Sequence, residues 1–125
     1  MMGGLGGGPD VADGATISIV TLPLTRGRTP SVVKHVFTLC TPGASVAMAV
    51  TEAGIALNPA HPLYEELKED LTKAGIRLTT IEELQAICES IVGVPDPIET
   101  TGRVVAVVEY RDGTVIDVIR EIKKD

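Results

Sequence analysis

The stretch VVAVVEYRDGTVIDVIREI, residues 104–122, decides the fold class of this 125-residue chain. Two runs rich in Val and Ile flank Asp112-Gly113. Asp-Gly in this setting is the usual signature of a two-residue hairpin loop, because both loop positions need positive φ. Such a loop predicts four cross-strand pairs: Tyr110 with Val115, Val108 with Asp117, Val107 with Val118, and Ala106 with Ile119.

This register places apolar side chains on both sides of the ribbon. A solvated antiparallel sheet would instead alternate apolar and polar residues. The run 104–108 is almost continuously apolar, which is typical of a strand covered on both faces. The chain must therefore supply two covers for the ribbon, or one of them must come from a partner.

The remaining pattern predicts an α/β protein with an open mixed sheet and flanking helices. Leu63, Leu67 and Leu71 recur every four residues and predict a helix over 62–74. Thr80 and Glu83 form a capping box at the start of a second helix with an apolar stripe of Ile81, Leu84, Ile87, Cys88 and Ile91. The expected strands cover 16–22, 32–39, 46–50, 55–57 and 76–78, and TRGRTP (25–30) is expected to be a loop. Two helices are too few to cover both faces of a sheet with five or six strands.

Composition narrows the class of partner. The net charge of −6 argues against nucleic acid or an anionic membrane as a partner. No stretch approaches the roughly 20 apolar residues of a membrane span, and the N-terminus lacks the features of a leader. Cys40 and Cys88 lie far apart in apolar segments, so we expect two buried thiols in a reducing compartment and a cytoplasmic protein.

The chain opens with a Gly-rich stretch. We expect residues 1–15 to form an irregular loop or tail, and residues 16–125 to form a single α/β domain. Clustered glycines let backbone N–H groups approach a phosphate, but that role needs a strand before the loop. Nothing precedes GGLGGGPD (3–10) except two Met residues. On spacing alone, a phosphate cradle and a simple tail both remain open.

Several motifs resemble the C-terminal part of the citrate lyase α subunit, and together they cover essentially the whole chain. They are GLGGGPDVADGA (4–15), TLPLTRGRTPSVV (21–33), LCTPGASV (39–46), VTEAGIALNP (50–59), TIEELQ (80–85) and PIETTGRVVAVVEYRDGTVIDVIRE (97–121). That family is the citrate CoA-transferase, or citrate–acyl carrier protein transferase, component and a relative of the CoA-transferase superfamily. The resemblance implies that the chain is the end of one CoA-transferase (NagB/RpiA-like) half, with upstream sequence covering the ribbon.

The implied reaction replaces acetate by citrate on a thioester of CoA or an acyl carrier protein. The implied partners are the lyase β subunit and the carrier protein, with citrate and an acetyl thioester as substrates and no cofactor bound by this chain. Self-association is a further expectation. The family's Gly-Gly-x-x-Asp loop maps onto Gly6, Gly7 and Asp10, and glycine N–H groups suit a developing oxyanion. The commoner family form has His where Leu5 and Gly8 stand here, so polar contacts from these two positions are not expected.

The catalytic carboxylate is left unassigned. The Ser-Glu-Asn-Gly-like motif that supplies it in many CoA-transferases does not occur here, and we assign Glu52 a structural role. Arg26 and Arg28 form a close basic pair whose guanidinium groups match a carboxylate or phosphate; a solvated loop or a subunit contact is the alternative. His35 and His61 have no second ligand at metal spacing, so no metal site is expected.

Two hypotheses of different class therefore remain. The chain is a portion of a transferase that is incomplete and inactive alone, or it is a free-standing small module that binds an acid or docks a subunit without turnover. The pattern does not separate citrate from citramalate as the acid substrate.

Overall fold

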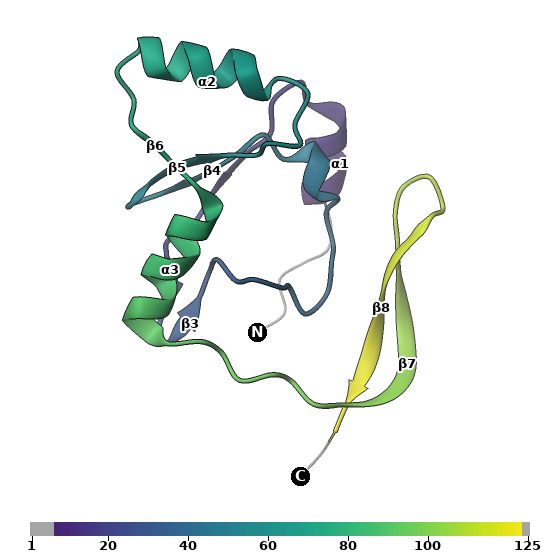
Figure 1. Cartoon of the computed structure of the whole chain (residues 1–125). Coiled ribbons are helices and arrows are strands. Elements are labelled where there is room, and N and C mark those ends of the chain that lie inside the picture. The colour runs from purple at the N-terminus through teal and green to yellow at the C-terminus, as the bar shows by residue number, and fades with distance from the viewer. Residues whose placement is uncertain (1–6, 124–125) are drawn as a thin grey trace.

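A computed structural model describes residues 7–123 (Figure 1). Its main sheet has four strands in the order β1 (Ile19–Thr21), β4 (Met48–Thr51), β5 (Gly54–Leu57) and β6 (Leu78–Thr79). The outer pairs β1–β4 and β5–β6 are parallel, and the central pair β4–β5 is antiparallel. The expectation of a mixed open sheet in an α/β protein is confirmed.

Two helices flank this sheet, α2 (Tyr64–Lys73) and α3 (Ile81–Val92). The predicted capping box at the start of α3 is present. The hydroxyl of Thr80 accepts from the backbone N–H of Glu83 at 3.1 Å, and the Glu83 carboxylate accepts from the N–H of Thr80 at 2.9 Å. Hydrogen bonds from the Thr79 hydroxyl and then from the Thr80 N–H lower the pKa of Glu83. The helix ends at Gly93, whose φ of 81° is favourable only for glycine.

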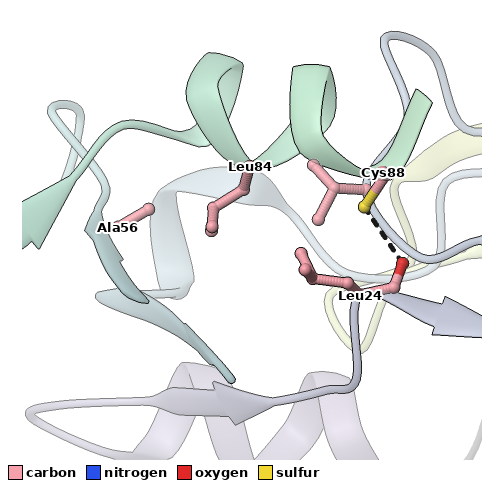
Figure 2. Close-up of a cluster of buried hydrophobic side chains, with 5 residues drawn as sticks. Leu24, Ala56, Leu84 and Cys88 are labelled. Carbon is pink, nitrogen blue, oxygen red and sulfur yellow. Dashed lines mark hydrogen bonds between the residues drawn. The ribbon is translucent and has the colours of Figure 1, made fainter. Parts of the chain in front are cut away.

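The core is small and centres on α3. Leu84 and Cys88 are fully buried and point toward Leu24 and Ala56 (Figure 2). Ile87 and Ile91, which share the predicted apolar stripe, are exposed. Only part of the stripe is therefore covered within the chain.

Strands β7 (Thr100–Glu109) and β8 (Val115–Ile122) form a separate antiparallel ribbon (Figure 1). Three predicted pairs are confirmed, those of Ala106, Val107 and Val108. The fourth is wrong, because Val115 pairs with Glu109 and not with Tyr110.

The reason lies in the hairpin loop. Tyr110 donates its N–H to the Thr114 carbonyl at 2.8 Å, and Gly113 donates to the Tyr110 carbonyl at 2.9 Å. Within this loop only Gly113 has positive φ (86°), so Asp112 avoids the left-handed conformation that a two-residue loop would require. The loop therefore has three residues, a tight turn followed by one left-handed glycine.

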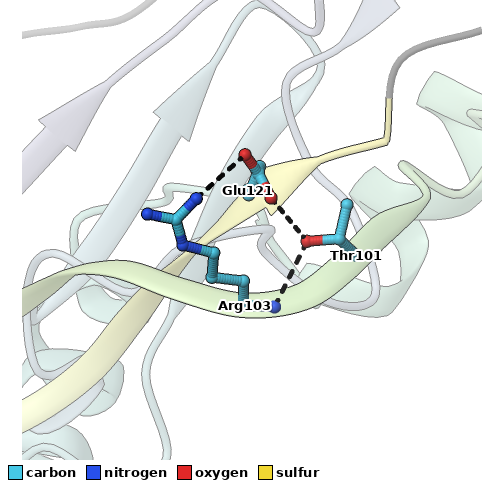
Figure 3. A network of polar contacts seen from close by, with 3 residues as sticks. All are labelled: Thr101, Arg103 and Glu121. Carbon is cyan, nitrogen blue, oxygen red and sulfur yellow. Dashed lines mark hydrogen bonds and ion pairs between the residues drawn. The ribbon is translucent and has the colours of Figure 1, made fainter.

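Strand β7 is irregular near its start. Thr100 pairs with Ile122 and Val104 with Arg120, so β7 carries two extra residues between these pairs. Gly102 has φ 83° at this point. Figure 3 shows how Glu121 of β8 holds the irregular segment, accepting from the Thr101 hydroxyl at 2.9 Å and facing the Arg103 guanidinium at 3.6 Å.

Four further expectations need correction. The ribbon does not join the main sheet, so the described residues form one four-stranded sheet and two separate hairpins instead of a single sheet of five or six strands. The stretch Gly7–Gly14, expected to be irregular, is a third helix, α1. The expected loop at 25–30 is a small hairpin. The expected strand at 32–39 is irregular because it has no neighbouring strand to pair with; one of its amides, Leu39 N–H, donates to the Asp117 carboxylate of β8 at 2.6 Å.

Much apolar surface stays in contact with solvent. The accessible area is 8804 Å², whereas a compact monomer of this mass exposes about 6,400 Å². Val104, Val105 and Val107 of the ribbon are each about half exposed, and only Val108 of this run is buried. The edge strand β1 exposes Ile19 and Val20, which point to opposite faces. Within residues 7–123, no helix is both long and apolar enough to cross a bilayer.

Candidate functional site

The predicted arginine pair lies at the tip of the small hairpin formed by β2 (Thr25–Arg26) and β3 (Thr29–Pro30). Arg26 pairs with Thr29, which leaves Gly27 and Arg28 as a two-residue loop. Gly27 has φ 63° and Arg28 does not have positive φ. Glycine at the first loop position is the requirement of a type II′ turn, which explains the sequence Arg-Gly-Arg locally.

The base of this hairpin is fixed to the core through Leu24. Both carboxylate oxygens of Glu52, in the β4–β5 turn, accept from the Leu24 N–H, at 3.0 and 3.1 Å. The thiol of Cys88 in α3 donates to the Leu24 carbonyl at 3.0 Å (Figure 2). The backbone of one residue is thus held from both sides. This contact confirms a structural role for Glu52.

The two guanidinium groups themselves face solvent. Arg26 and Arg28 are exposed, and among residues 7–123 neither makes an ion pair or a side-chain hydrogen bond. Two such groups on a short rigid turn can bind a carboxylate or a phosphate with paired hydrogen bonds.

The second predicted group lies at α1. Gly7 begins the helix and Asp10 lies in its first turn, while Gly6 is outside the described residues. A Cβ added at Gly7 would meet no other atom within 4 Å, so the space around this backbone is open. Asp10 lines a pocket of about 470 Å³ together with Cys40 and the end of β7.

An ion pair ties α1 to the tip of the ribbon. The Arg111 guanidinium contacts the Asp13 carboxylate at 2.9 Å. Beside it, the pKa of Tyr110 is raised, first by burial and then by a hydrogen bond to Asp13 and by its charge. The phenol therefore stays protonated over the physiological range. Asp13, Tyr110 and Arg111 were not predicted as site residues, and the 98 residues between Arg111 and Asp13 leave no local signal that would have indicated the contact.

The structure does not bring the two predicted groups together within this chain. Figure 1 shows β3 beside α3, and α1 on a different side of the molecule near the ribbon tip. Any ligand that contacts Asp10 and the arginine pair at once would have to span this separation.

Other candidate residues have simpler roles. Cys88 is a buried free thiol, and Cys40 is free and half-buried. Within residues 7–123, no cluster of three or more His, Cys, Asp or Glu side chains could hold a metal ion. His35 is exposed, whereas His61 is buried and makes a local hydrogen bond.

The mixed sheet and its flanking helices define the chain as part of a mixed α/β protein. Its exposed arginine hairpin and the open backbone at the start of α1 are groups suited to anions. The family model for "citrate lyase, alpha subunit (CitF)" matches residues 1–122. The chain therefore belongs to the citrate lyase alpha subunit family.

Known relatives agree with this assignment. The citrate lyase alpha chain of Klebsiella pneumoniae is 56% identical over 123 residues, which are 98% of this chain and 24% of that relative. The citrate lyase alpha chain of Escherichia coli K12 is 49% identical over 124 residues, with shares of 99% and 24%. The chain thus spans about a quarter of the length of these relatives.

A solved structure agrees as well. A crystal structure from Streptococcus mutans, described as an alpha subunit of citrate lyase in complex with citrate, superposes with a TM-score of 0.86 at 44% identity. The match covers 92% of this chain and 22% of that one.

Proposed function

We propose that this chain forms part of a citrate lyase alpha-type transferase, which exchanges acetate for citrate on a thioester of an acyl carrier protein or CoA. In this exchange a citryl group replaces the acetyl group on the carrier thiol, and acetate is released. The observation that carries the proposal is the family match over residues 1–122. The lyase β subunit and the carrier protein would be the partners.

Within this proposal the arginine pair binds an anionic group, either a citrate carboxylate or the phosphate of the carrier's prosthetic group. The support is its exposure and its rigid base at Leu24. Gly6, Gly7 and Asp10 would lie near the acyl group, with glycine N–H groups as donors to the developing oxyanion. The catalytic carboxylate would come from outside this chain.

The exposed apolar surface supports assembly with further protein. The total accessible area, polar and apolar together, exceeds that of a compact monomer by about 2,400 Å², which is as large as a stable protein interface. Exposed valines on β7 and apolar residues on both faces of β1 would be covered by the remainder of a longer subunit. The isolated chain is therefore expected to be inactive in the exchange, and robust turnover by the purified chain would refute this.

The experiment that tests the arginine pair uses a full-length subunit containing this sequence. Both Arg26 and Arg28 are replaced by Gln, and citryl transfer to the carrier protein is followed by mass spectrometry across a range of citrate concentrations. Loss of two charge-assisted contacts should raise the half-saturating citrate concentration by about tenfold or more.

The matched control is Arg103→Gln, which removes an exposed guanidinium that contacts Glu121 and not a candidate ligand. It should leave the citrate dependence unchanged. If the double variant matches this control in its dependence on both citrate and carrier-protein concentration while transfer continues, the arginine pair is a solvated loop and the transferase proposal stands. If full-length wild-type protein transfers no citryl group, the transferase proposal itself is wrong.

A further inference from the structure

A second pocket, of about 550 Å³, shares Tyr110 as a lining residue with the Asp10 pocket. Its walls come from the end of α1, the short 3₁₀ turn η1 (Gly43–Ser45) and the loop before α2. The walls are mainly apolar, including Ala12, Pro42 and Leu63. Neither the arginine pair nor Gly7 or Asp10 lines it.

One wall of this pocket is the imidazole of His61. Among the polar residues that the structure describes, His61 is the one that is buried, with 8% of its surface exposed. Its Nδ1 accepts from the backbone N–H of Leu63 at 3.2 Å. A ring nitrogen that accepts carries no hydrogen, so the neutral ring has its hydrogen on Nε2. The local turn therefore fixes the tautomer.

No described residue accepts a hydrogen bond from the Nε2–H donor. Within residues 7–123 the bond to Leu63 is the imidazole's one hydrogen bond. The one fully enclosed side-chain nitrogen or oxygen without a partner in this part of the chain is Ser31 Oγ. Nε2 of His61 is not among the fully enclosed atoms, so it keeps some access to solvent, and the ring that carries it lines the pocket.

The other polar walls determine which ligand suits this donor. Asp13 is the charged wall residue and already contacts Arg111, which is not part of this pocket. The Ser45 hydroxyl donates to the Pro42 carbonyl at 2.7 Å. Tyr110 keeps its proton because its pKa is raised. Because Asp13 is already paired with Arg111, the lining offers an anion no free basic group, whereas a neutral acceptor needs none.

We infer that this pocket binds the carbonyl oxygen of a small uncharged amide or ester-type group, with His61 Nε2–H as the hydrogen-bond donor and the apolar walls around its carbon atoms. This inference is independent of the proposed transferase role. A peptide carbonyl from another protein segment presents the same acceptor, and the test separates it from a small molecule.

The chain has only two histidines, so the imidazole signals of His61 and His35 can be assigned directly. The purified chain, labelled with ¹⁵N, is titrated with N-methylacetamide, with pantetheine as a larger neutral diamide, and with acetate as an anion. We expect the neutral amides to shift His61 Nε2 saturably and to leave the exposed His35 unchanged. Acetate should bind at least about fivefold more weakly than N-methylacetamide, because it loses its hydration without gaining a basic partner in the pocket.

A matched variant is His61→Asn, whose side-chain oxygen can still accept from the Leu63 N–H while it lacks the Nε2 donor. Binding to the variant is measured from the backbone amide signals of Leu63 and Tyr110. The variant should bind N-methylacetamide at least about fivefold more weakly, which is the loss expected for one neutral hydrogen bond. The inference is overturned if His61 does not shift, if it shifts no more than His35, or if acetate binds as well as the amide.

A second measurement uses a full-length subunit. Modification of His61 by diethyl pyrocarbonate, followed by peptide mass spectrometry, should be slowed severalfold by N-methylacetamide or pantetheine. If His61 reacts at the same rate with and without these molecules, the small-molecule assignment is wrong. If it is already unreactive without them, although the amide shifts His61 in the short chain, a protein segment occupies the pocket in the full-length subunit.

Discussion

Replacing Glu52 by Ala tests how the arginine hairpin is held. Leu24, which bears the N–H that Glu52 binds, is 4% exposed, so water can replace the lost carboxylate only in part. A hydrogen bond to a charged acceptor contributes about 1.5–3 kcal/mol, and a buried donor left without a partner costs about 1–3 kcal/mol. Because the Glu52 carboxylate itself lies near solvent, we expect the lower part of this range, about 1–2 kcal/mol.

Thermal unfolding followed by circular dichroism measures this effect. For a chain of this length, 1 kcal/mol corresponds to roughly 4 °C in Tm, so Glu52→Ala should lower Tm by about 4–8 °C. Glu52→Gln keeps one acceptor and should fall between the variant and wild type.

The matched control is Asp70→Ala in α2, which removes an exposed carboxylate that makes no side-chain hydrogen bond or ion pair with another residue of 7–123. Its effect should stay within about 0.5 kcal/mol. Equal Tm values for Glu52→Ala and Asp70→Ala would refute the anchoring role of Glu52.

Three further changes give separate tests. Gly54→Ala should destabilise the chain by about 1–3 kcal/mol, because Gly54 has φ 153° and a Cβ there would lie 2.9 Å from Thr79 Cγ2. Adding Thr79→Ser should recover part of this stability in urea unfolding. If nothing is recovered, the backbone conformation of Gly54 alone explains the loss. Hydrogen bonds from the Leu39 and Val118 N–H groups lower the pKa of Asp117. The stabilisation from Asp117 is therefore complete above its unfolded-state pKa near 3.8 and is lost as the pH falls through its lower folded-state pKa. Acid unfolding of Asp117→Asn should lack this part of the pH dependence, and an acid-unfolding curve identical to that of wild type would contradict it. Val107→Asp should reduce self-association of the chain and its binding of a hydrophobic dye, since Val107 is 53% exposed on the ribbon. A wild-type chain that is monomeric and does not bind such a dye would show that this surface is covered.

Local chemistry made much of the fold predictable. The capping box of Thr80 and Glu83 fixes the start of α3 within four residues of sequence, and the apolar runs place β4 and β5. The II′ hairpin at 25–30 was missed and taken for a loop, although Gly27 before Arg28 is the residue order that such a turn requires.

The errors arose where distant contacts decide the structure. Glycine-rich sequence argues against helix, yet Gly7–Gly14 is helical and tied to Arg111 through Asp13. Residues 32–39 have a strand-like pattern but no strand to pair with. The arginine pair was found from its charge, but its anchor joins Glu52 to Leu24 across 28 residues, a contact that no local pattern indicates.

The irregular register of the β7–β8 ribbon also affects how its exposed valines can be used. Relative to β8, β7 has extra residues between Thr100 and Val104 and again between Val104 and Ala106. Opposite Val108 and Glu109, the extra residue lies on β8. Such bulges bend and twist a strand, so a second copy cannot continue the ladder along a straight, regular edge. Fibril-like stacking is thereby disfavoured even though the side chains are apolar. Burial of the valines then requires a partner that packs on the face of the ribbon and matches its curvature.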